Sequence, residues 1–249
     1  MNSITAIVNV YRRPQNLEMQ VKSLVNQSVK PDQIWAWRNY HKDGNDLDLS
    51  SVAGLERWFD SNYNWKYYGR FAAALLADTE FVAIFDDDTV PGKDWFLNCL
   101  NSIEKDNGIM GSAGVILNSK IYADHFRCGW PTKNEKTERV DLVGHAWFFR
   151  REWLKYLWME KPFTWDNAED IQFSYLAQKY GGIQTFCPPH PRNNPMLHGS
   201  LLAEKLGVDD KASSCNPNKT EANKFTIERD LAVENALKNG WKTIKMISL

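Results

Sequence analysis

The stretch FVAIFDDDTVPG, residues 81–92, decides the fold. Residues 81–85 form a short apolar run that ends in three carboxylates, and Pro91 and Gly92 then force a turn. A short apolar run followed by turn residues is typical of a buried strand in a mostly parallel sheet. Such sheets bind their ligands just beyond the carboxyl ends of the strands. We therefore expect the aspartates to lie at a binding site.

The three carboxylates repel one another unless a cation or hydrogen-bond donors offset their charge. Alternation along an extended chain sends Asp86 and Asp88 to one side and Asp87 to the other. Asp86 and Asp88 can therefore converge on one hard divalent ion. The alternative is a solvated acidic turn, but acidic turns rarely follow a buried strand so directly.

Length and composition favour a globular α/β protein. The 249 residues permit one large domain, or one domain with an appendage, and an apolar content of 43% supports a substantial core. The formal net charge of −1 and the lack of a basic stripe argue against nucleic-acid binding. The 11 tryptophans offer flat faces for sugar rings or bases, although tryptophan also fills cores.

The cysteine pattern and the termini favour the cytoplasm. Cys99, Cys128, Cys187 and Cys215 are far apart and form no CxxC pair, which argues against a zinc site and favours reduced thiols. We see no signal peptide and no apolar run as long as a membrane span.

The chain opens with a β-α-β pattern. Residues 4–10 and 34–37 are apolar strands, and Pro14 suits the first turn of a helix between them. This opening indicates a nucleotide-binding α/β layer. Further strands are expected at residues 109–117, 140–149 and 183–186. Helices are expected at residues 52–60, 72–77, 151–158, 168–180 and 225–239 and directly after Asp94, whereas residues 122–138 are predicted to form a loop over the site.

Three arginines follow or flank these strands where a phosphate would lie. Arg12 and Arg13 come directly after the first strand, and Arg70 precedes a predicted helix near its N-terminus, a natural anion site. The alternative for Arg12 and Arg13 is a surface position, and for Arg70 a structural ion pair.

A second polar stretch lies at residues 163–170. Asn167 is expected to cap the helix, which leaves Glu169 and Asp170 in its first turn. Acids at that place often only complement the helix dipole. The functional interpretation is a carboxylate positioned over a reacting sugar. Adjacent helical residues point about 100° apart, and we favour Asp170 as the nearer one because its shorter side chain is held more rigidly.

These residues together fit sugar transfer from a nucleotide diphosphate. A hard divalent ion on carboxylates typically also holds diphosphate oxygens, and arginines share the charge of the leaving phosphate. A further carboxylate, Glu169 or Asp170, then takes a proton from an acceptor hydroxyl or stabilises an oxocarbenium-like centre.

The chain resembles GT-A-type glycosyltransferases of the family-2-like and exostosin-like kind over residues 4–200. IFDDD resembles the DxD signature of that fold, and VDLVGHAWFF with WDNAEDIQFSYLAQKYGG resembles the exostosin-like acceptor-side strand and helix start. The resemblance implies a mostly parallel α/β sheet flanked by helices. We expect a catalytic domain at residues 1–205 and a C-terminal extension with one helix at residues 206–249.

The resemblance also implies roles for individual residues. Asp88 would be the main ligand of Mn²⁺ or Mg²⁺, Asp86 would serve the metal or the ribose, and His198 would match a late metal-binding histidine. His190 is the competitor of His198. The residues expected at the nucleotide of a UDP-sugar donor are Tyr11, Arg12, Arg13, Arg70, Asp86 and Asp87. Glu169 or Asp170 would sit at the sugar, opposite a glycan or other hydroxyl acceptor.

Two other classes of protein remain. In a phosphatase of the haloacid-dehalogenase type, Asp86 would attack a phosphate and Asp88 would act as acid and base. That motif normally opens the fold, whereas here a β-α-β unit precedes it. A non-catalytic sugar- or nucleotide-binding protein is the second alternative.

Overall fold

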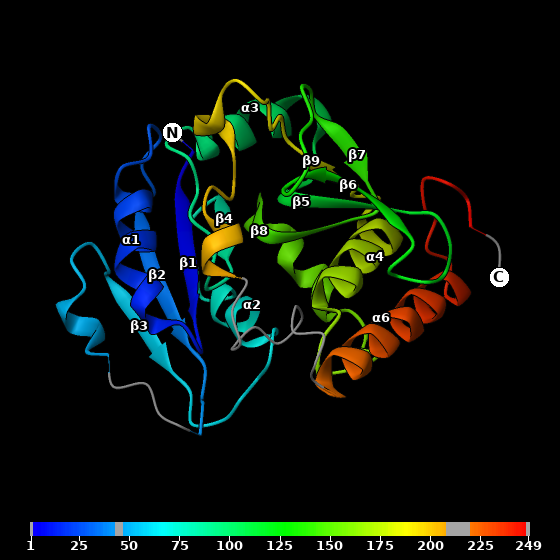
Figure 1. Cartoon of the computed structure of the whole chain (residues 1–249), viewed down its shortest axis with the longest axis horizontal. Coiled ribbons are helices and arrows are strands. Elements are labelled where there is room, and N and C mark those ends of the chain that lie inside the picture. The colour runs from blue at the N-terminus through cyan, green and yellow to red at the C-terminus, as the bar shows by residue number, and fades with distance from the viewer. Residues whose placement is uncertain (1, 43–46, 208–219, 248–249) are drawn as a thin grey trace.

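The computed structural model describes residues 2–42, 47–207 and 220–247. Its described strands form one nine-stranded sheet in the order β3-β2-β1-β4-β8-β5-β9-β7, with β6 paired to β5 (Figure 1). The strands are β1 (Ile4–Val10), β2 (Gln33–Arg38), β3 (Arg57–Asp60), β4 (Phe81–Phe85), β5 (Ile109–Leu117), β6 (His125–Gly129), β7 (Glu138–Val140), β8 (Leu142–Arg150) and β9 (Thr185–Cys187).

Helices flank the sheet, and the last of them lies near the C-terminus of the chain. The α-helices are α1 (Leu17–Val25), α2 (Gly69–Ala74), α3 (Trp95–Asp106), α4 (Glu169–Gly181), α5 (Ala203–Leu206) and α6 (Thr220–Lys238). Short 3-10 helices are η1 (Pro14–Asn16), η2 (Leu49–Ser51), η3 (Arg151–Trp158) and η4 (Pro195–Leu197). The expected α/β sheet flanked by helices is confirmed.

The sheet topology places the aspartates beside β8. Strands β3, β2, β1 and β4 run parallel, so that β1 and β4 end at the same edge. β8 then pairs with β4 in the antiparallel direction, and the register sets Phe85 opposite Ala146. The residue after β4 therefore meets the residue before Ala146: the Asp86 amide donates to the His145 carbonyl at 3.0 Å.

The core holds this edge in place. All five residues of β4 are buried, and Phe81 stacks on Phe148 of β8 with ring centroids 5.1 Å apart. A second apolar cluster joins α4 to α6 through Tyr175, Leu176 and Val233. Figure 1 shows α6 lying beside α4. The proposed boundary at residue 205 stays a prediction.

Three local expectations were wrong. Residues 57–60 are a strand and not part of a helix, because they extend the sheet in parallel with β2. The segment 122–138 is not only a loop, because β6 within it pairs with β5. Asn167 does not cap α4: the N-cap is Ala168, in a left-handed conformation with φ of 66°, and the Asn167 side chain donates to Glu228.

No helix among the described residues is both long enough and apolar enough to cross a membrane.

Candidate active site

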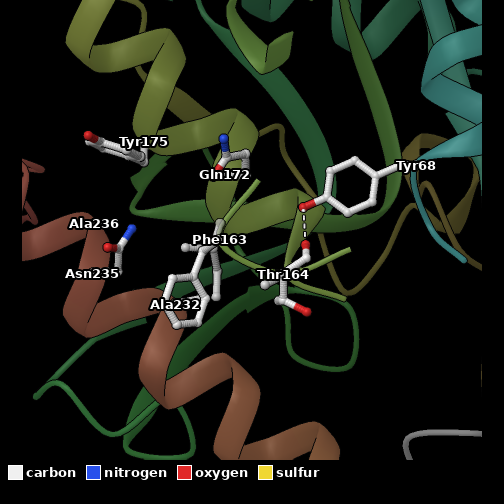
Figure 2. Close-up of a pocket in the computed structure, with 10 residues that line it drawn as sticks. Tyr68, Phe163, Thr164, Gln172, Tyr175, Ala232, Asn235 and Ala236 are labelled. Carbon is white, nitrogen blue, oxygen red and sulfur yellow. Dashed lines mark hydrogen bonds between the residues drawn. The ribbon is translucent and has the colours of Figure 1, made fainter. Parts of the chain in front are cut away.

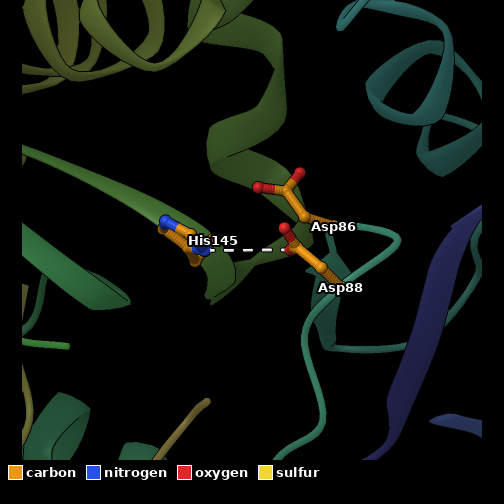
Figure 3. Close-up of side chains that lie close together, drawn as sticks. All are labelled: Asp86, Asp88 and His145. Atoms are coloured by element: carbon orange, nitrogen blue, oxygen red, sulfur yellow. Dashed lines mark ion pairs between the residues drawn. The ribbon is translucent and has the colours of Figure 1, made fainter. Parts of the chain in front are cut away.

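Asp86, Asp88 and His145 form a compact group at the carboxyl end of β4. One ligand atom from each lies within 4.8 Å of the others. Figure 3 shows the two carboxylates and the imidazole pointing toward one another, with His145 Nδ1 3.9 Å from Asp88 Oδ1. The aspartates reach this point from the turn after β4 and the histidine from β8.

His145 has features of a ligand rather than of a core residue. Its φ is 64°, an uncommon conformation for a residue with a side chain. Its Nδ1 is buried with no hydrogen-bond partner, and Trp130 packs against the ring at 4.2 Å between centroids. Burial lowers the His145 pKa to about 4, partly opposed by Asp86, so the ring is neutral at pH 7. Neutral imidazole is the form that binds metals.

The carboxylates of this group carry unbalanced charge. Burial, followed by repulsion from Asp86 and Asp87, raises the pKa of Asp88 to about 7. Arg13 Nη1 lies 3.6 Å from Asp88 and offsets only part of this effect. Two carboxylates, an orphaned imidazole nitrogen and a raised pKa fit a divalent cation with oxygen and nitrogen ligands, as Mn²⁺ accepts.

Arg13, which follows β1, is buried and hydrogen-bonded to two other segments of the protein. Arg13 Nη1 donates to Asp87 Oδ1 at 2.7 Å, and its Nη2 donates to the Gly207 carbonyl at 3.0 Å. Burial raises the pKa of Asp87, and the guanidinium of Arg13 opposes that shift. Arg13 thus ties the acidic turn to the segment after α5. Arg12 is less buried, and its backbone amide faces the Asp87 carboxylate.

Tyr11 lies at the same edge of the sheet. Its hydroxyl accepts from Asn64 Nδ2 at 3.0 Å, and its ring meets His41 edge-on at 5.2 Å between centroids. Tyr11 therefore stands between the end of β1 and the two loops that follow β2 and β3. The family resemblance implied that Tyr11 lines the nucleotide, and that role stays a prediction.

Arg70 connects the acidic turn with the start of α4. It is 2% exposed, forms an ion pair with Asp86, and donates from Nη2 to Glu169 Oε1 at 3.0 Å. Its guanidinium also packs on the Trp147 ring, 4.9 Å from the centroid. The structural ion pair considered for Arg70 is therefore present, and it lies at the site.

The two acids of α4 face different partners. Glu169 is buried beside Arg70, and burial together with the Asp170 charge raises its pKa to about 7. Asp170 accepts from Arg229 Nη2 at 2.6 Å through Oδ2, and from the Ile171 amide at 2.8 Å through Oδ1. Sequence reasoning missed Arg229, because nothing in α6 signals a contact 59 residues away.

His198 is not brought to the aspartates in the described structure. Its Nε2 donates to the Pro191 carbonyl at 2.8 Å, and its ring stacks on His190 at 5.2 Å between centroids. The Nε2 of His190 also has a hydrogen-bond partner, because it accepts from the Gly199 amide at 3.1 Å. In the described structure His145, and not His198, thus lies with the two aspartates. The sequence marked His145 only by a Gly-His pair that interrupts an apolar strand.

A separate pocket lies between α4 and α6. Figure 2 shows its lining, with Tyr68 donating to the Thr164 carbonyl at 3.1 Å. Its volume of about 10 Å³ corresponds to roughly one water molecule, which is far too small for a sugar. The candidate site is therefore the acidic edge and not this pocket.

A family model described as Glycosyl transferase family 2 matches residues 5–158. The chain belongs to this family. The match covers β1 through β8 and so includes Asp86, Asp88 and His145, although Glu169 and Asp170 lie beyond it.

Solved structures show the same fold. The crystal structure of S. aureus TarS matches this family 2 chain with a TM-score of 0.51 and 18% identity, over 75% of this chain and 36% of that one. TarS 1–349 in complex with UDP matches with a TM-score of 0.56 and 16% identity, over 76% and 58%. This chain thus spans about a third to three fifths of their lengths. No curated protein matches it.

The chain has a GT-A fold and belongs to Glycosyl transferase family 2. Family membership favours sugar transfer over the phosphatase and the non-catalytic binding protein, and the activity itself is taken up as a proposal below.

Proposed function

We propose that this chain moves a sugar from a nucleotide diphosphate, with UDP as the nucleotide, to a hydroxyl of a glycan or similar acceptor. The observation that carries the proposal is the Asp86–Asp88–His145 group inside the segment matched by the family. The UDP in the related TarS 1–349 structure supports the choice of nucleotide.

The metal of this proposal is Mn²⁺, with Mg²⁺ as the second choice. Asp86, Asp88 and His145 would hold it, because their ligand atoms converge and the imidazole nitrogen lacks another partner. A divalent ion bound there supplies a Lewis acid that stabilises the negative charge of a leaving diphosphate. A nitrogen ligand beside two carboxylates favours Mn²⁺ over Mg²⁺, which prefers oxygen.

The arginines and Tyr11 serve the nucleotide in this proposal. Tyr11 faces the base, and Arg12 is the arginine exposed enough to reach the phosphates. Arg70 and Arg13 hold Asp86 and Asp87 in place, so that two of the three charges of the acidic turn are balanced before the donor binds and Asp88 is left for the cation. Repulsion among the three aspartates would otherwise displace them.

The start of α4 serves the reacting sugar. Asp170 acts at the reacting centre, either as the base for the acceptor hydroxyl or as the anion beside the oxocarbenium-like carbon. Its two oxygens each accept one hydrogen bond here, and a carboxylate has about four acceptor positions, so capacity for a substrate proton remains. Glu169, which is linked to Asp86 through Arg70, binds hydroxyls of the donor sugar.

A thermal-shift screen tests the proposal. UDP, UDP-glucose, UDP-galactose and UDP-N-acetylglucosamine are each added with Mn²⁺ and with EDTA, and GDP serves as the matched control. A ligand that binds only the folded state raises the melting temperature, so we expect a rise with UDP compounds in Mn²⁺ that EDTA removes. Equal shifts in Mn²⁺ and EDTA would contradict metal-dependent binding, and a shift with GDP alone would contradict the choice of UDP.

A further inference from the structure

Arg229 of the C-terminal helix is buried against the start of α4. Its side chain is 5% exposed, and its Nη2 lies 2.6 Å from Asp170 Oδ2. The guanidinium also packs over the Tyr122 ring, 3.9 Å from the ring centroid, and lies 5.4 Å from the centroid of the Phe225 ring. Packing against these rings restricts the orientation of the guanidinium and therefore the direction of its hydrogen bonds.

Other polar contacts hold α6 in the same place. Glu228 accepts from Asn167 Nδ2 at 2.6 Å, just before Glu169 and Asp170 in the chain. Asp230 accepts from the Tyr122 amide at 2.6 Å. Three successive residues of α6 therefore contact the start of α4 or the segment that packs on it. These three contacts fix α6 against the start of α4.

We propose that Arg229 is a positioning residue for Asp170 and that α6 is thereby part of the active site. The inference rests on the proposed function, in which Asp170 acts at the reacting centre. It assigns the C-terminal helix a role in the reaction, whereas the family match ends at residue 158.

The reason lies in the two adjacent buried carboxylates. Glu169 and Asp170 repel each other, and each is paired with a different buried arginine: Arg70 holds Glu169, and Arg229 holds Asp170. Without Arg229, Asp170 would keep only the Ile171 amide as a partner, and its side chain would turn toward the nearest remaining positive charge. Arg229 thus keeps the two carboxylates apart and fixes the direction of the Asp170 oxygens.

The test is a double-mutant cycle on UDP release from UDP-sugars in Mn²⁺. Asp170→Asn should lower kcat by about 100-fold, the usual effect of removing a positioned catalytic carboxylate. Arg229→Gln should lower kcat by on the order of 10-fold or more and change the KM for the donor by less than about twofold. Because Arg229 acts through Asp170, the double variant D170N/R229Q should be no slower than D170N.

Two further variants separate positioning from folding. Arg229→Lys keeps a charge at this point and should recover part of the lost kcat. Lys238→Gln removes a positive charge from the same helix at an exposed surface pair with Glu234, and it should leave kcat unchanged. If Arg229→Gln alone fails to fold, the double variant D170N/R229Q leaves neither charge of the buried pair without its partner. Comparing its kcat with that of D170N then still tests whether Arg229 acts through Asp170.

Multiplicative losses in the double variant would overturn the inference, as would a rise in KM with unchanged kcat. A wild-type protein without UDP-sugar turnover would overturn the proposed function and this inference with it, whereas multiplicative losses in an active enzyme would leave the proposed function standing.

Discussion

Asp88 is the residue on which the predicted metal dependence rests most heavily. Asp88→Asn keeps the shape of the side chain but removes the charge that a divalent ion needs. We expect turnover to fall by on the order of 100-fold or more, while circular dichroism and the melting temperature in EDTA show an intact fold. Calorimetry should show a matching loss of Mn²⁺ affinity.

The control for this variant is Asp94→Asn, because Asp94 lies at the start of α3, and its side chain makes no capping hydrogen bond there. Wild-type rates in a folded Asp88→Asn protein would return the acidic stretch to a solvated turn.

The third ligand is a choice between His145 and His198. The structure brings His145 to the aspartates, so His145→Ala should raise the Mn²⁺ concentration for half-maximal activity by about 10-fold or more. His198→Ala, with its ring on the Pro191 carbonyl, should change that concentration by less than about twofold. The opposite pattern would restore the ligand set that the sequence predicted.

The outcome at single residues shows what a sequence pattern contains. Asp86 and Asp88 could be predicted because a strand followed by a turn fixes where both carboxylates point. His145 could not be assigned, because its position depends on the antiparallel register that sets Phe85 opposite Ala146. Arg229 likewise depends on how α6 packs on α4. Contacts between distant segments leave no local periodicity to read.

At the scale of elements, long apolar patterns were predictable and short strands were not. β1 and β5 have the predicted boundaries, because strands buried on both faces are nearly continuous apolar runs. β3 and β6 were missed. β3 has mostly exposed residues, and β6 is only partly buried. Each pairs with one other strand only, so neither has the apolar run that marks a buried strand in the sequence.

Substitutions at the C-terminal end of α4 test how this helix end contributes to stability, and they leave the residues of the candidate site unchanged. Gly182 follows the helix in a left-handed conformation with φ of 65°, and a Cβ there would meet nothing within 4 Å. Gly182→Ala should therefore cost only the backbone strain, about 1 kcal/mol, or roughly 2–4 °C in melting temperature. Gly182→Asn should cost less, because asparagine tolerates this conformation.

Activity per folded molecule should stay unchanged in both Gly182 variants, because the whole of α4 separates Gly182 from Glu169 and Asp170. A Gly182→Ala protein as stable as the wild type in urea denaturation would show that the helix end relaxes into another conformation.

At the scale of the whole molecule, the sheet order creates the site. Asp86, His145 and Glu169 lie on separate elements of the chain. The antiparallel pairing of β8 with β4 places His145 beside Asp86. Arg70 then links Asp86 to Glu169 at the start of α4. The α/β class followed from alternating strands and helices. The position of β8 within the sheet did not, because strand order is set by packing of both sheet faces rather than by any one segment.

Buried groups at this edge predict how the stability of the whole protein depends on pH without metal. The folded-state pKa of Asp88 and of Glu169 is raised to about 7, so both bind a proton in the folded chain where the unfolded chain has lost it. Their contribution to the free energy of unfolding therefore declines as pH rises toward 7. His145 and His190 have folded-state pKa values of about 4 and act oppositely, but only below their usual value of about 6.5.

Between about pH 4.5 and 6.5 the acids and the histidines largely offset each other, whereas above pH 6.5 the histidines are more than half neutral even in the unfolded chain and the titration of the acids dominates. We expect the free energy of unfolding in EDTA to change little from pH 5 to 6.5 and to fall by about 1 kcal/mol from pH 6.5 to 8. Urea denaturation at half-unit pH steps measures this. In Mn²⁺ the fall should shrink or reverse, because the ion binds ionised carboxylates and competes with protons for them. Stability in EDTA that rises between pH 6.5 and 8 would mean that Asp88 and Glu169 are already ionised in the folded protein below pH 6.5, with Arg13 and Arg70 sufficient to balance them.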